Sequence, residues 1–120
     1  KSQLAILVTY FNPDSFKMDC YLIDMVQLDD GKAGTIFNAV VKCFEQKGIP
    51  MENVIGFCAD TCNTMFGAHH SVAQMLVANY PWIIPVKCAC HLIHLCASHA
   101  SLQLPKYLED LCRNISSYFH

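Results

Sequence analysis

Asn53-Val54-Ile55-Gly56-Phe57-Cys58-Ala59-Asp60 is a short apolar run that ends in an acidic residue, and this stretch decides the fold class. It predicts a buried strand over residues 53–59. A turn-rich loop follows, and then a helical pattern over 68–80 that a proline ends. The next apolar stretch predicts a strand over 83–87, with a helix over 89–101 behind it. This alternation of strand and helix implies parallel pairing of the two strands.

Upstream of this stretch, the pattern predicts a hairpin and a helix. Residues 4–11 form a continuous β-branched and aromatic run that a turn sequence closes, and a second apolar run ends at Leu28. Together they predict an antiparallel hairpin over 4–28. Apolar residues then recur at helical spacing until stop signals near Gly48, which predicts an amphipathic helix over 33–47.

Downstream, the sequence predicts one more amphipathic helix, over 105–119. Its apolar stripe runs from Leu104 to Phe119 at helical spacing and needs a partner surface. No repeat, low-complexity stretch or linker divides the chain, so we expect residues 1–120 to form one unit. The element order is that of an α/β layered fold, with an antiparallel pair followed by parallel strand–helix units.

Composition and charge narrow the possible partners. The chain has 120 residues, a net charge of -2 and a pI of about 6.3, so it has no basic field to hold a polyanion. Any affinity for nucleic acid must therefore come from a site or from another domain. No apolar stretch approaches the roughly 20 residues of a membrane helix, so we expect no membrane span. The 8 cysteines are expected to be reduced thiols of a cytosolic or nuclear protein, because no signal peptide is evident.

Asp60 is the first candidate site residue. It stands at the carboxyl end of a predicted buried strand, where ligand and metal sites gather in open α/β sheets. The alternative is an Asx turn or a helix cap, because aspartate is favoured where a strand becomes a turn. Position and spacing alone leave both interpretations open.

Four potential metal ligands lie in one stretch of seven residues at the start of the predicted helix over 89–101. They are Cys88, Cys90, His91 and His94. Zinc is one interpretation, although ligands packed this closely rarely all reach one tetrahedral ion. The other is a mixture of buried thiols and solvated imidazoles on a helix whose buried face carries Leu92, Leu95, Cys96 and His99. A third interpretation is a catalytic Cys/His nucleophile pair, but no nearby residues indicate an oxyanion hole. We expect small-hydrophobe roles for Cys58 and Cys62, and a solvated His69-His70 pair.

Several motifs, taken in order, resemble the catalytic core of hAT-family transposases, as in the domesticated zinc-finger proteins derived from them. The matching stretches cover nearly the whole chain: 3–11, Thr35-Ile36-Phe37-Asn38, Gly48-Ile49-Pro50, 53–60, Asn63, Met65, Gly67, 87–96, and Leu104-Pro105 with the helix after it.

The resemblance implies an RNase H-like fold, a mixed sheet flanked by helices, in which three acidic residues hold two divalent ions. Such ions, Mg²⁺ or Mn²⁺, activate the attacking oxygen and stabilise the leaving oxygen of a phosphodiester. In that pattern Asp60 resembles the second acid and ancestral metal ligand. Cys88 and His91 match the family's C-x-x-H pattern, which lies next to the active site and close to nucleic acid. The resemblance also implies DNA as the parent family's partner and the nucleus as the location.

The sequence departs from the family pattern in two ways. Thr61 follows Asp60 where the family often has glycine, and threonine disfavours a left-handed turn conformation. The first catalytic Asp is expected on a strand before Leu4 and the last acid beyond His120, so the first, central strand of the sheet is expected to be missing. Either a gap remains in the sheet or the hairpin shifts to fill it.

Three functional hypotheses follow from these observations. The first is a segment of a transposase-derived domain whose ancestral activity was metal-dependent DNA strand transfer, with no enzymatic activity and no cofactor in these 120 residues. The second is a protein-interaction or dimerisation module of a domesticated nuclear protein, which uses the stripe from Leu104 to Phe119. The third is a small zinc-binding domain.

Overall fold

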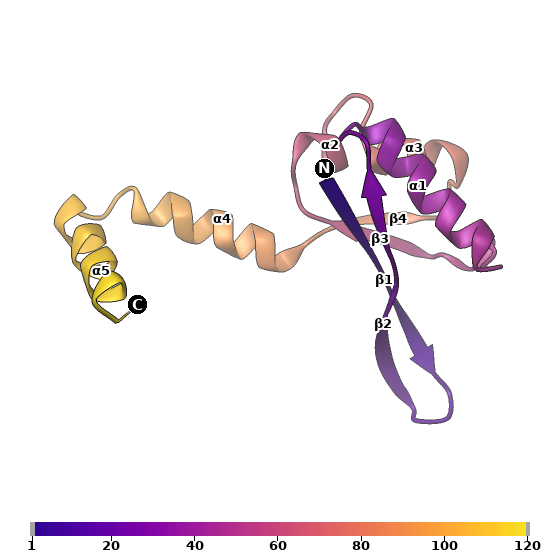
Figure 1. Cartoon of the computed structure of the whole chain (residues 1–120), viewed down its shortest axis with the longest axis horizontal. Helices are drawn as coiled ribbons and strands as arrows, with labels where there is room; N and C mark the ends of the chain where they lie inside the picture. The colour runs from indigo at the N-terminus through magenta and orange to yellow at the C-terminus, as the bar shows by residue number, and fades with distance from the viewer. Residues whose placement is uncertain (1, 120) are drawn as a thin grey trace.

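The computed structural model describes residues 2–119 of the chain (Figure 1). It contains both helices and strands, which confirms the mixed α/β class. The elements, in chain order, are β1 (Ser2–Asn12), β2 (Lys17–Leu28), α1 (Ala33–Gln46), the 3₁₀ turn η1 (Met51–Asn53), β3 (Gly56–Ala59), α2 (Asn63–Phe66), α3 (Val72–Asn79), β4 (Ile84–Lys87), α4 (Ala89–Ser101) and α5 (Lys106–Phe119).

β1 and β2 form the antiparallel hairpin that the sequence predicts. Their register runs from Ser2 opposite Leu28 to Asn12 opposite Lys17, with an irregularity between Ile6 and Leu7. The Asn12 side chain organises the turn, because its Oδ1 accepts a hydrogen bond from the Asp14 backbone N–H at 3.0 Å. Asparagine side chains stabilise turns in this way, by replacing a backbone acceptor. The turn is therefore closed by local chemistry, whereas Ile6 of β1 and Leu28 of β2 anchor the hairpin in the core.

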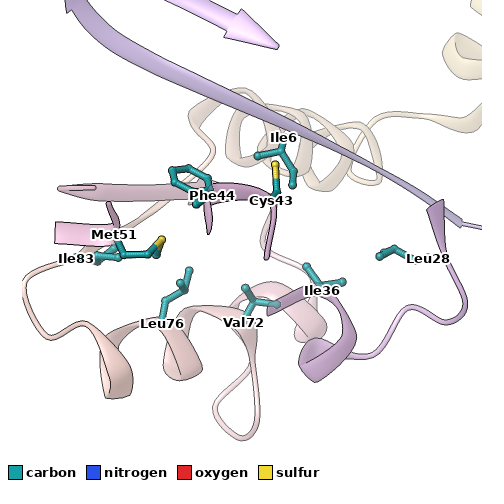
Figure 2. Packing of buried hydrophobic residues seen from close by; sticks show 9 residues of the cluster. All are labelled: Ile6, Leu28, Ile36, Cys43, Phe44, Met51, Val72, Leu76 and Ile83. Carbon is teal, nitrogen blue, oxygen red and sulfur yellow. The ribbon is translucent and has the colours of Figure 1, made fainter. Parts of the chain in front are cut away.

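The core lies between α1, α3 and the inner ends of the strands (Figure 2). Val72 is fully buried and Leu76 is 2% exposed on α3, and they face Ile36 and Phe44 of α1. Ser71 is also fully buried and caps α3, since its Oγ accepts from the Gln74 backbone N–H at 3.4 Å. This cap starts the helix at Val72, four residues later than the prediction over 68–80.

The stretch before Asp60 is less regular than predicted. The strand expected over 53–59 is limited to β3, because Met51–Asn53 coils into the turn η1. The Val54 N–H donates to the Met51 carbonyl at 3.0 Å, and the Met51 side chain is 8% exposed within the core. Because the Met51 side chain is anchored in the core, residues 51–53 coil into η1 and do not extend the strand. The short helix α2, where the sequence predicts only a loop, follows Asp60.

The strands form two separate two-stranded sheets, β1-β2 and β3-β4. β3 and β4 are parallel, from Gly56 opposite Ile84 to Ala59 opposite Lys87, as the strand–helix–strand order predicts. Within residues 2–119 no ladder joins β1 to β3, so the expected single mixed sheet is not formed. The sequence left two outcomes open, a gap in the sheet or a hairpin that shifts to fill it. The structure shows the gap, which lies between β1 and β3. β1 and β3 each keep one unpaired edge.

α4 and α5 extend away from the body of the molecule (Figure 1). The radius of gyration is 18.4 Å, whereas a compact domain of this length has about 14 Å. Neither helix has a buried residue, so the expected buried face of the helix over 89–101 is wrong, and Leu92 is 41% exposed. The physical reason is that no neighbouring element covers that face. None of the helices within residues 2–119 has the length and hydropathy needed to cross a membrane.

Candidate functional site at the carboxyl ends of β3 and β4

Backbone pairing brings two of the predicted site residues to one edge of the β3-β4 sheet. Asp60 directly follows β3 and Cys88 directly follows β4. The Cys88 N–H donates to the Ala59 carbonyl at 2.8 Å, which extends the parallel ladder by one bond. Because parallel strands end at the same side, the segments after them leave the sheet side by side. His91 lies in the first turn of α4, just beyond Cys88.

The Asp60 carboxylate is used locally in this structure. Its Oδ1 accepts from the Cys62 backbone N–H at 3.1 Å, which is the i, i+2 bond of an Asx turn. The turn alternative that the sequence left open is therefore present. Thr61 does not take a left-handed conformation, since among the described non-glycine residues only Phe16 and His70 have positive φ. The loop accommodates threonine by avoiding the conformation that favours glycine.

Hydrogen bonds and charge keep Asp60 ionised. The hydrogen bond with the Cys62 side chain lowers the pKa of this carboxyl most, followed by the Cys62 backbone bond, and the electrostatic interaction with His91 acts in the same direction. The same hydrogen bond raises the pKa of the Cys62 thiol, because it holds the proton on sulfur. Lowering a carboxyl pKa contributes stability above the unfolded-state value near 3.8, and this stability is lost as the pH falls through the folded-state pKa. Asp60 is exposed, so solvent screening keeps the contribution small.

The histidines and remaining cysteines of the predicted cluster do not converge. Cys88 and His91 are half-buried, whereas Cys90 and His94 are exposed. The rings of His91 and His94 lie 6.5 Å apart between centroids, on successive turns of α4. The structure thus leaves Cys88 and His91 partly covered at the start of α4 and leaves Cys90 and His94 on the solvent side.

The side chains around Asp60 decide whether a divalent metal ion fits there. Within residues 2–119, no three His, Cys, Asp or Glu side chains are grouped so that they could hold an ion. The side chains that act on the pKa of the Asp60 carboxyl are the Cys62 thiol and the His91 imidazole. Mg²⁺ prefers an octahedral shell of oxygens, so one carboxylate with a protonated thiol and an imidazole does not fit it. The side chains that act on Asp60 therefore do not make up a Mg²⁺ site in the part of the chain described.

Cys62 is the residue of this site that the sequence interpretation missed, since it was expected to act only as a small hydrophobe. The signal was present, because Asp followed two residues later by a backbone donor is the spacing of an Asx turn. His69 and His70 lie apart from the site, exposed at the start of α3, as the sequence predicts.

Comparison with known proteins does not change this picture, since no family model, curated protein or solved structure matches the chain. The function therefore has to be inferred from the site's geometry and from the sequence motifs. Both centre on the loop that begins at Asp60.

Proposed function

We propose that the chain derives from the RNase H-like core of a hAT-family transposase and no longer catalyses DNA strand transfer. In this proposal Asp60 is a former metal ligand. Cys88 and His91 are the remnant of the family's C-x-x-H pattern, which lies close to nucleic acid. DNA is the ancestral substrate, and the nucleus is the location that the resemblance implies.

One observation carries the proposal: Asp60 is an exposed carboxylate at the carboxyl end of the parallel strand β3, and Cys88 and His91 follow the carboxyl end of its partner strand β4. The order of the elements also supports the proposal, because an antiparallel hairpin precedes the parallel pair.

The inactive state follows from the donors around Asp60. Two-ion phosphodiester chemistry requires several carboxylates around a pair of cations. The Asp60 Oδ1 is already engaged by the Cys62 backbone, and the neighbouring side chains are a thiol and an imidazole. One exposed carboxylate cannot position both ions, so the residues described here lack the means of activating a nucleophile.

The test is a nicking assay on supercoiled plasmid with Mg²⁺ or Mn²⁺. We expect the chain and its Asp60→Asn variant to leave the plasmid equally intact, with Glu52→Gln as a control at an exposed acidic residue outside the loop. If the chain nicks DNA in the presence of the metal and Asp60→Asn abolishes the nicking, the inactive state is refuted. Nicking by all three proteins alike would indicate a contaminating nuclease, and the preparation would be repeated after further purification.

A second candidate function, a dimerisation module, is favoured by the apolar face of α5. Tyr107 is 68% exposed, Leu111 53% and Ile115 51%, and these residues recur at helical spacing. Soluble monomers rarely leave such a stripe uncovered. The opposite face carries Glu109 and Arg113, whose 2.6 Å ion pair stays in solvent.

Sedimentation equilibrium tests this candidate. We expect self-association of the chain in the micromolar range, and loss of it when Leu111 and Ile115 are both changed to lysine. The matched control is Ser116→Lys with Ser117→Lys, which adds the same charge to the same helix outside the stripe. A monomer at all concentrations, or equal loss of association in both double variants, would count against the module.

A further inference from the structure

We draw no further inference here: the strongest candidate, the apolar tip of the β1-β2 hairpin, where Phe16 is 83% exposed and packs edge-on against Phe11 with ring centroids 5.5 Å apart, carries nothing because no feature of residues 2–119 shows what covers it.

Discussion

Leu76→Ala is expected to lower the free energy of unfolding by about 2–4 kcal/mol, the typical cost of truncating a buried leucine. Leu76 is 2% exposed on α3 and belongs to the cluster that joins α3 to α1 and to Ile83 before β4 (Figure 2). The loss combines the transfer free energy of the removed methyl groups with a cavity that the neighbours fill only in part. It is a large share of the roughly 5–15 kcal/mol that holds a domain folded.

Urea denaturation followed by circular dichroism measures this effect, as a lower midpoint at an unchanged slope. Leu102→Ala is the control, because Leu102 is 75% exposed after α4 and its truncation should cost less than about 0.5 kcal/mol. If Leu76→Ala abolishes folding altogether, Leu76→Met provides the measurement, with an expected cost below about 1.5 kcal/mol. A loss below about 1 kcal/mol for Leu76→Ala would show that α3 does not pack as described.

Gly67→Ala is expected to destabilise the loop that carries Asp60, by about 1–3 kcal/mol, the usual cost of forcing extra atoms into a filled space. The Gly67 N–H donates to the Asn63 carbonyl at 2.9 Å and closes α2. A Cβ at this position would overlap the backbone O, C and Cα of Asn63. Backbone atoms cannot rotate away like a flexible side chain, so the bond and the helix must give way. The φ of -61° is ordinary, so the cause is steric and not conformational.

The consequence would reach β3, because Phe66 of α2 stacks on Phe57 with ring centroids 5.8 Å apart. Thermal unfolding should show a lower Tm, by roughly 4–8 °C for each kcal/mol in a domain of this size range. Gly31→Ala is the matched control, since nothing lies within 4 Å of an added Cβ there. Equal Tm values for the two alanine variants would contradict the tight approach of Gly67 to Asn63.

Elements with strong local signals were predictable from the sequence. The helix expected over 33–47 is α1, because apolar residues face the core every three or four positions and Gly48 ends it with a left-handed φ of 65°. Asp60 was placed correctly at the end of a strand, and its Asx-turn alternative is present. Both features depend on residues only a few positions apart, which the sequence displays directly.

Elements that depend on distant contacts were not predictable in the same way. The start of α3 is an exception, because the sequence carries a capping pattern there: Ser71 is followed three residues later by glutamine. The turn η1 had none, because it forms where the Met51 side chain enters the core. The expected buried face of α4 was wrong because a helical apolar pattern describes the helix alone and not the surface that covers it.

By itself, the sequence determined the hairpin and its closure at Asn12, the long helices, the parallel strand–helix–strand order, and the place of Asp60 after a strand. These follow from short-range sterics and hydrogen bonding, which neighbouring residues control. Only the tertiary structure decided that the strands form two sheets with a groove between them, that the segments after Ala59 and Lys87 leave one sheet edge together, and that α4 and α5 stay uncovered. Burial and pairing require a second surface, and whether that surface exists is a property of the assembled chain.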